Sequence, residues 1–490
     1  MHTTLIFTPT TPTASTDTSA AATSVDHGTR WAGAHLALAG LLAALALMAG
    51  ALLRLELLTP GLDFIQARNF GVLLSLHGTL LFYFLALPLF PAVLGALRVP
   101  ALLGRRSLLF PRLSALAFGL LAAGATCVVG GFVCGGTEAG WMFDTALDGR
   151  FNLPGTAPAA CGVLLGALAL VALCVNLLAT ILAAPRGDRS GPFLSAMLGV
   201  GFTGLLAGAM LVSLLTAVLA GALFGFTVFE AGQGGQPHLF PLLFRFFSSP
   251  AQNLLVLGAL GAVLDVLARR APARPADARV HRVLFTVVAV AGALAWDGAA
   301  AVSSLGPGAV FYHALLNGIT CVAAGLLLAQ GVALLRRAEQ PLDAPALYAL
   351  GFLITFAATL GTGFALALPG TRIALGRTLF ATAHLHTVML AVLGLAFLGA
   401  LHAVWDTLTG RTYREGPARA AALLILVGTP LAFGPLFLCG RAGLPFRANA
   451  YPAEFQLLHT LAGAGATVLL AGLTLAVINL LTARRTTAAS

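Results

Sequence analysis

Two histidines stand two residues apart in a long apolar stretch of the C-terminal half of the chain. His384 and His386 belong to the run Phe380–Leu390. Each residue of an α-helix turns about 100° around the axis, so side chains two residues apart point to nearly opposite faces. The two imidazoles therefore cannot share one metal ion, although each could bind a different centre. The alternative is a pair of buried histidines that bond to neighbouring carbonyl groups.

A third histidine, His77, lies in a second apolar run, Leu74–Phe84. Taken alone, His77 could be a ligand of a metal centre or, just as readily, a hydrogen-bonding group between two helices. Imidazoles are costly inside a membrane and are usually functional there. Because neutral imidazole is the usual axial ligand of haem iron, three such histidines in one chain suggest haem.

The composition places these histidines in a membrane. Of the 490 residues, 59% are hydrophobic and 9% are charged, whereas an ordinary soluble domain is about 25% charged. All 27 basic residues are arginine, since the sequence contains no lysine, and they lie in short loops between apolar runs. Membrane topology explains this positive charge better than nucleic-acid binding does, so we expect no nucleic-acid partner.

The apolar runs predict an all-α fold, a polytopic membrane bundle of 12 transmembrane helices at about 20 residues per span. This bundle takes up residues 31–483, with a disordered tail rich in Thr, Ser and Ala before it (1–30) and a short tail after it (484–490). The predicted spans are 32–53, 70–97, 113–136, 157–185, 193–227, 239–268, 283–303, 308–335, 346–368, 379–407, 418–439 and 455–482.

The arginines predict the orientation of the bundle. With the N-terminus inside, nineteen arginines fall on the inner side, seven on the outer side and one, Arg245, within a span. Positive residues favour the cytoplasmic side, so we expect both termini in the cytoplasm. The membrane that we expect is a bacterial inner (cytoplasmic) membrane. The outer arginines are Arg54, Arg68, Arg150, Arg372, Arg377, Arg441 and Arg447.

Several short motifs occur in the order that they have in one known family. Over about residues 33–480, the chain resembles subunit I of cytochrome c oxidase, in the haem–copper oxidase superfamily. Each motif alone is a weak signal, but the ordered set is a strong one. The motifs are Leu53–Leu57, His77-Gly78, Phe110–Ser114, Gly140-Trp141, the Gly232–Pro237 turn before Leu243–Phe247, Ala383–His386, Gly443–Arg447 and Tyr451-Pro452.

The resemblance implies two haems. His77 and His386 would be the two axial ligands of a low-spin haem. His384 would be the single axial ligand of a high-spin haem on the other face of the same helix. Arg54 matches an arginine near the ring substituents of the low-spin haem, and Arg447 matches one of a pair that binds haem propionates.

The residues that bind copper in the family are replaced. Its single histidine ligand corresponds to Ser249, its cross-linked tyrosine to Asn253, and its His-His pair to Asp297 and Gly298. Ala251 stands in place of a glutamate that delivers protons in many members. Copper that cycles between redox states favours imidazole ligands. We therefore expect no copper at this vacated copper site, which consists of Ser249, Asn253, Asp297 and Gly298.

The proton and magnesium sites of the family are depleted as well. No lysine is present for a lysine-type proton channel, Ser107 replaces the aspartate at the mouth of the other channel, and Gly376-Arg377 replaces the magnesium ligands. Four-electron reduction of oxygen needs the copper, the tyrosine and a supply of protons. We therefore expect neither magnesium nor normal oxygen reduction.

Two arginines could compensate for these losses. Arg245 stands where the family usually has a tryptophan, and a buried cation needs a partner, which could be a propionate of the high-spin haem or Asp297. Alternatively, Arg245 extends to the outer interface of the membrane. Arg377 could supply the positive charge of the missing magnesium. Phe446 stands in place of the second arginine of the pair that binds haem propionates in the family.

We therefore predict a membrane haem protein that carries electrons from a bis-histidine haem to a second histidine-bound haem in a respiratory-type complex. Expected partners are subunits like II and III of the oxidases and a cytochrome or copper-protein electron donor. An open sixth position on the second haem could bind O2, NO or CO. The alternatives are an active terminal oxidase or nitric oxide reductase with an unusual second metal site, and a non-enzymatic haem or gas sensor or assembly protein.

Overall fold

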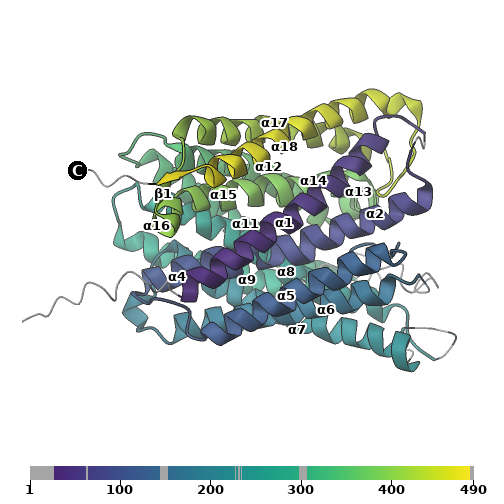
Figure 1. The fold of residues 1–490 in the computed structure, drawn as a ribbon, viewed down its shortest axis with the longest axis horizontal. Coiled ribbons are helices and arrows are strands. Elements are labelled where there is room, and N and C mark those ends of the chain that lie inside the picture. The colour runs from purple at the N-terminus through teal and green to yellow at the C-terminus, as the bar shows by residue number, and fades with distance from the viewer. Residues whose placement is uncertain are drawn as a thin grey trace, which may run out of the picture.

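The structure is a bundle of long helices that lie side by side (Figure 1). The computed structural model describes residues 27–61, 64–143, 153–226, 228, 229, 232, 234–296 and 306–485. Within these ranges, eleven helices are long and apolar enough to cross a membrane, which confirms the predicted all-α membrane bundle. They are Thr29–Glu56, Ala67–Leu102, Pro111–Val133, Thr156–Leu182, Pro192–Gly221, Leu239–Ala268, Pro307–Arg336, Ala344–Ala367, Leu379–His402, Glu415–Arg441 and Ala453–Leu481.

A twelfth crossing is consistent with helix α9 (Pro275–Leu294), which has charged residues in its first half. It overlaps the predicted span 283–303, of which the part from residue 297 lies outside the described residues. Asp277 near the start of α9 pairs with Arg337, which directly follows α11 (Pro307–Arg336), at 2.8 Å. The chain therefore begins α9 at the end of the bundle where α11 finishes, and it must cross the bundle before α11 begins.

Two of the spans are composed of several elements, because π-helical turns interrupt them: η2 and η3 in Ala67–Leu102, and η8 in Leu379–His402. The helices in chain order are α1 (His27–Glu56), α2 (Ala67–Thr79), η2 (Leu80–Ala86), α3 (Leu87–Leu89), η3 (Phe90–Gly95), α4 (Ala96–Leu102), α5 (Pro111–Val133), α6 (Thr156–Leu182), η6 (Arg186–Asp188), α7 (Pro192–Phe224), α8 (Leu239–Ala268), α9, α11, α12 (Ala344–Ala367), α13 (Pro369–Leu375), α14 (Leu379–His386), η8 (Thr387–Val392), α15 (Leu393–His402), α16 (Trp405–Thr409), α17 (Glu415–Arg441), η9 (Ala453–Phe455) and α18 (Gln456–Leu481).

We call the end of the bundle that carries α16 the inner end and the end that carries α13 the outer end (left and right in Figure 1). At the inner end, strand β1 (Arg411–Thr412) pairs antiparallel with β2 (Arg484–Arg485). The first two residues of the predicted C-terminal tail are therefore bound to the bundle. The rest of that tail, from residue 486, and residues 1–26 of the predicted N-terminal tail lie outside the described residues.

The spans that carry the candidate ligands and the vacated copper site are the most enclosed of those described. Ala67–Leu102, Leu239–Ala268 and Leu379–His402 have the largest buried share among the eleven spans. In the peripheral pair α17 and α18, glycine permits close contact, since a Cβ added to Gly465 would lie 2.2 Å from the backbone nitrogen of Ala432. Small residues allow helix backbones to approach one another closely in lipid.

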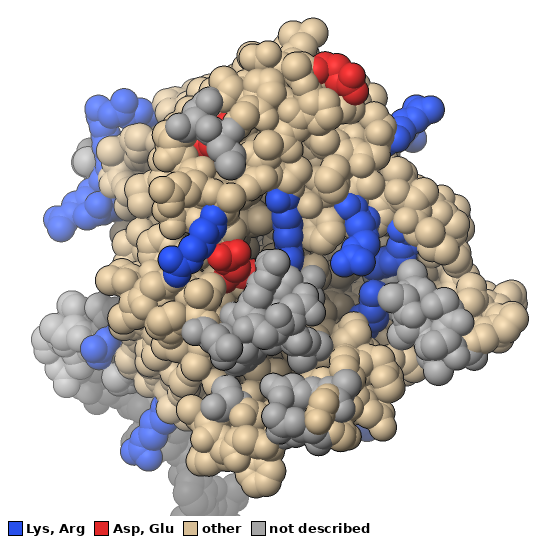
Figure 2. Space-filling model, turned by 90° about the vertical axis from the view of Figure 1, so that its right-hand side faces the viewer, with Lys and Arg blue, Asp and Glu red and all other residues tan. Residues whose placement is uncertain are grey.

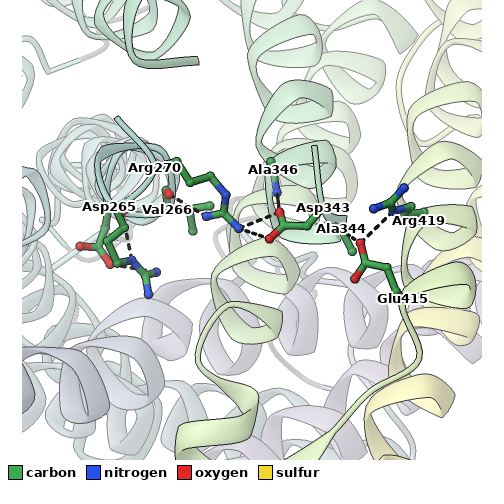
Figure 3. A network of polar contacts seen from close by, with 9 residues as sticks. Asp265, Val266, Arg270, Asp343, Ala344, Ala346, Glu415 and Arg419 are labelled. Carbon is green, nitrogen blue, oxygen red and sulfur yellow. Dashed lines mark hydrogen bonds and ion pairs between the residues drawn. The ribbon is translucent and has the colours of Figure 1, made fainter. Parts of the chain in front are cut away.

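Two ion pairs and one hydrogen bond link four helices at the inner end (Figure 3). Arg98 on α4 bonds to Asp265 on α8 at 2.9 Å. Arg270, just after α8, bonds to Asp343, the N-cap of α12, at 2.6 Å. We call this group the inner belt. Glu415 on α17 accepts from the backbone N–H of Ala344 at 2.6 Å and from Arg419 at 2.7 Å. The members of the inner belt are Arg98, Asp265, Arg270, Asp343, Glu415 and Arg419.

Candidate functional site

The imidazole rings of His77 and His386 face one another in the centre of the bundle. Their centroids lie 5.8 Å apart and their planes are within 9° of parallel. His77 lies on α2 and is 7% exposed, while His386 is the last residue of α14. Two helices that are far apart in the sequence therefore bring together the two histidines that were predicted to share one haem.

Both rings are anchored through Nδ1. Nδ1 of His77 lies 2.7 Å from the carbonyl oxygen of Ala46 on α1, and Nδ1 of His386 lies 2.8 Å from that of Thr382. A carbonyl can only accept, so each Nδ1 must carry the proton and each Nε2 must carry the lone pair. In the part of the chain that the structure describes, neither Nε2 makes a hydrogen bond. An anchored Nδ1 with an available Nε2 is the usual state of a metal-binding histidine, so this pair fits haem iron.

His384 is directed to a different side of its helix. Its Nδ1 lies 2.9 Å from the hydroxyl oxygen of Thr362 on α12. A Cβ added to the next residue, Gly363, would lie 3.2 Å from the Cε1 atom of His384. His386, in contrast, has the ring of Phe433 on α17 at 5.9 Å. The two histidines thus contact different neighbouring helices, as expected from their spacing of two residues.

Each of the paired histidines is followed by a π-helical turn. The turn η8 begins directly after His386, and η2 begins three residues after His77. Wide turns of this kind often occur at functional sites. The apolar pattern of the sequence contains no signal for them.

A glycine on α1 makes room for His77. A Cβ added to Gly50 would lie 2.8 Å from Cε1 and 3.0 Å from Nδ1 of His77. Together with the carbonyl of Ala46, one turn earlier, Gly50 forms the wall against which the ring rests. Sequence reasoning missed Ala46, Gly50 and Thr362, because such common residues inside apolar helices have nothing to distinguish them.

The guanidinium of Arg54 is hydrogen-bonded to His459 in the first turn of α18. One of its terminal nitrogens, Nη2, lies 2.7 Å from Nδ1 of His459, and it donates to the carbonyls of Leu57 at 2.8 Å and His459 at 3.1 Å. The ring of Tyr451 stacks on His459 at 3.9 Å. Nε of Arg54 and Nε2 of His459 are buried, and the described residues offer neither a hydrogen-bond partner. Sequence reasoning gave His459 no role, although it is the principal side-chain contact of Arg54.

Arg447 contacts another of the predicted motifs. A Cβ added to Gly140 would lie 2.5 Å from Nη2 of Arg447, and the Arg447 guanidinium lies 5.1 Å from the centre of the Phe446 ring. Arg447 has a φ of 62°, a left-handed conformation that costs about 1–3 kcal/mol in residues other than glycine and is typical of functional sites. Trp141, next to Gly140, would clash with a Cβ on Gly78 at 2.9 Å. The Gly140-Trp141 motif therefore lies between Arg447 and the residue after His77.

The described half of the vacated copper site is held together by hydrogen bonds. The hydroxyl of Ser249 on α8 lies 2.9 Å and 2.7 Å from the carbonyl oxygens of Gly292 and Ala295 at the end of α9. The side-chain amide of Asn253 donates to the carbonyl of Ser249 at 2.8 Å, and a Cβ on Gly292 would lie 2.2 Å from its oxygen. Helices α8 and α9 are therefore in direct contact at residues that the resemblance matches to copper ligands.

The other predicted residues of this region are only partly described. Asp297 and Gly298 lie outside the described residues, so the pairing of Arg245 with Asp297 or with a haem propionate stays a prediction. Arg245 itself lies on α8 and is half-buried. Among the described residues, no group of three or more His, Cys, Asp or Glu side chains could hold a metal ion.

The outer end of the bundle carries arginine side chains around a hollow (Figure 2). Arg68, Arg377 and Arg441 are exposed, and the backbone carbonyl of Arg377 accepts from the N–H of Phe446 at 3.1 Å. The segments with Arg377 and Arg447 are thus hydrogen-bonded to one another at the outer end of the bundle.

Three comparisons with known proteins agree. The profile of the family described as Cytochrome C and Quinol oxidase polypeptide I matches residues 30–468. The chain is 27% identical over 431 residues to cytochrome c oxidase subunit 1 of Synechocystis sp., which covers 87% of this chain and 78% of that one. It is 29% identical over 430 residues to the alternative cytochrome c oxidase subunit 1 of Bradyrhizobium diazoefficiens, with 82% and 72% covered. A chain from the cryo-electron microscopy structure of a heme–copper terminal oxidase dimer has the same fold, with a TM-score of 0.73 at 16% identity over 94% of this chain and 84% of that chain.

Proposed function

The chain belongs to the cytochrome c and quinol oxidase polypeptide I family, and on that premise we propose that it is a membrane electron carrier with two haems and no copper. His77 and His386 would hold the low-spin haem, and His384 the high-spin haem. Haem iron bound in this way supplies a one-electron couple. The observation that carries this proposal is the nearly parallel pair of rings of His77 and His386, 5.8 Å apart.

The residues of the chain would position the two haems and exclude water from them. The carbonyls of Ala46 and Thr382 hold the tautomer and the orientation of His77 and His386. His384 lies two residues from His386, so the sites lie on opposite sides of one helix and an electron would cross only α14. Arg54 and Arg447, at the outer end, would hold polar substituents of the haems, which the buried Nε of Arg54 supports.

The absence of copper is supported by the donors at the vacated copper site. Ser249 and Asn253 offer a hydroxyl and an amide, both already used in hydrogen bonds. Copper in redox sites prefers imidazole and sulfur ligands. Normal oxygen reduction would lack its second metal, so the protein would transfer electrons and bind a gas without reducing it fully. It would work with other subunits and a cytochrome or copper-protein donor, in a bacterial inner membrane with both termini in the cytoplasm.

The experiment is an absorption spectrum of the purified full-length protein in the oxidised, reduced and CO-treated states, with metal analysis of the same sample. We expect two haems per chain, CO binding at one of them, and no copper. His384→Ala should remove the CO-binding haem and spare the other, whereas His386→Ala should remove the low-spin spectrum. His35→Leu is the control, because His35 bonds to Trp31 on its own helix and has no predicted ligand role.

Two results would contradict the proposal in different ways. Copper in proportion to haem, together with oxygen consumption or nitric oxide consumption, would favour the active oxidase or reductase. A protein without haem would favour an assembly role and would remove the basis for electron transfer.

A further inference from the structure

The three candidate ligands differ in what anchors them. His77 and His386 use backbone carbonyls, which no substitution can remove. His384 uses the side chain of Thr362, which belongs to a different helix, α12. Of the three histidines, only His384 has a hydrogen-bond partner that a substitution could remove.

The direction of the hydrogen bonds around Thr362 can be worked out. Its hydroxyl oxygen lies 3.1 Å from the carbonyl oxygen of Thr359 in the preceding turn. The carbonyl oxygen of Ala358 lies 3.4 Å from the same hydroxyl. Both carbonyls can only accept, so donation of the single hydroxyl proton to either of them leaves a lone pair for His384. We therefore assign the imidazole proton of His384 to Nδ1, which lies 2.9 Å from that hydroxyl oxygen. Nε2 keeps its lone pair, and it makes no hydrogen bond to any residue that the structure describes.

The neighbouring glycine confines the ring on a second side. A Cβ on Gly363 would lie 3.2 Å from Cε1 and 3.7 Å from Nε2 of His384. The pair Thr362-Gly363 thus offers a hydroxyl to one edge of the imidazole and a surface without a side chain to another.

We propose that Thr362 is a positioning residue for His384, which fixes its tautomer and orientation and sets how strongly it binds the high-spin haem iron. This inference rests on the proposed function, because it requires haem iron on His384. An acceptor on Nδ1–H raises the basicity of Nε2, and outer-shell partners of this kind are worth about 10- to 100-fold in metal affinity. Loss of the hydroxyl should therefore weaken the iron–histidine bond and raise the reduction potential of that haem.

The test compares three variants of the full-length protein. Thr362→Val keeps the shape and removes the hydroxyl, and Thr362→Ser restores the hydroxyl. Thr359→Val is the matched control, because the Thr359 hydroxyl bonds to Thr355 within α12 and is not an acceptor for His384. The measurements are the iron–histidine stretching band of the reduced protein by resonance Raman spectroscopy, the midpoint potential of the CO-binding haem and the haem content.

We expect Thr362→Val to lower the stretching frequency and raise the midpoint potential, and to reduce the haem affinity of that site by about 10- to 100-fold. The low-spin spectrum should be unchanged. Thr362→Ser and Thr359→Val should resemble the wild-type protein in all three measurements. If Thr362→Val is too unstable to purify, Thr362→Ala takes its place with the same expected shifts.

The outcomes separate this inference from the proposed function. Two haems in every variant, with the same band and potential in Thr362→Val as in Thr359→Val, would overturn the role of Thr362 and leave the proposed function intact. A wild-type protein with no iron–histidine band, or one whose band survives in His384→Ala, would overturn both.

Discussion

At the residue scale, His77 is fixed from three directions. The carbonyl of Ala46 holds its Nδ1, Gly50 leaves space for its edge, and the ring of His386 lies opposite. Two of these three contacts come from α1, so the first helix of the bundle determines the position of a candidate ligand on the second. A side chain on α1 at Gly50 would displace that ligand.

We predict that Gly50→Val removes the low-spin haem. The new Cβ would begin 2.8 Å from Cε1 of His77, and overpacking of this kind costs about 1–3 kcal/mol. The expected result is loss of the bis-histidine spectrum, with the CO-binding haem on His384 retained. Gly40→Val on the same helix is the control, because a Cβ there meets nothing within 4 Å. Equal low-spin spectra in the two variants would show that α1 does not position His77.

The sequence allowed part of this site to be predicted. The opposite facing of His384 and His386 follows from the helical repeat, and it agrees with their contacts to α12 and α17. The contact between Arg54 and His459 did not follow, because it joins residues 405 positions apart through a histidine with no motif around it. The resemblance indicated the candidate ligands, whereas only the fold identifies the groups that hydrogen-bond to them.

At the element scale, apolar runs predicted helices well and their internal geometry poorly. The predicted span 70–97 corresponds to a helix over Ala67–Leu102, and 193–227 corresponds to Pro192–Phe224. The π-helical turns inside two of the spans were not predicted. Hydrophobicity reports which residues lie in the membrane, but a single extra residue in one turn changes it too little to detect.

We predict that Gly465→Ala separates α17 from α18. The added Cβ would lie 2.2 Å from the backbone nitrogen of Ala432, which cannot move aside as a side chain can. We expect a loss of about 1–3 kcal/mol, measured as a lower thermal unfolding midpoint in detergent. Gly434→Ala on α17 is the control, since a Cβ there meets nothing within 4 Å. A midpoint for Gly465→Ala as high as that of the control would contradict this packing.

At the scale of the whole molecule, the inner belt joins α4, α8, α12 and α17. These helices come from separate parts of the chain, and the belt links them at the inner end (Figure 3). Its ion pairs are not equivalent. The Arg270 side chain is 9% exposed, whereas Arg419 and Glu415 are 47% and 41% exposed. Stability should therefore depend on the first pair and hardly on the second.

We predict that Asp343→Asn lowers stability much more than Arg419→Gln. The first change leaves the buried guanidinium of Arg270 without its carboxylate, a loss of about 3–5 kcal/mol in a fully buried pair and closer to about 2 kcal/mol here, because Asp343 is 39% exposed. The second breaks an exposed pair worth about 0–1 kcal/mol. Thermal unfolding followed by tryptophan fluorescence measures both. Similar midpoints for the two variants would show that Arg270 does not need this partner.

The π-helical turn after His386 is a place where this span can lose one residue without a change in the rotation of its other segments. A turn of this kind accommodates one more residue than an ordinary α-helical turn, so η8 (Thr387–Val392) can lose a residue and become regular while the segments on either side keep their rotation. A deletion in α15, which has no such turn, would rotate everything beyond it by about 100°. This span should therefore tolerate a change of length in one place, immediately beside its two histidines, where such a change would ordinarily be most harmful.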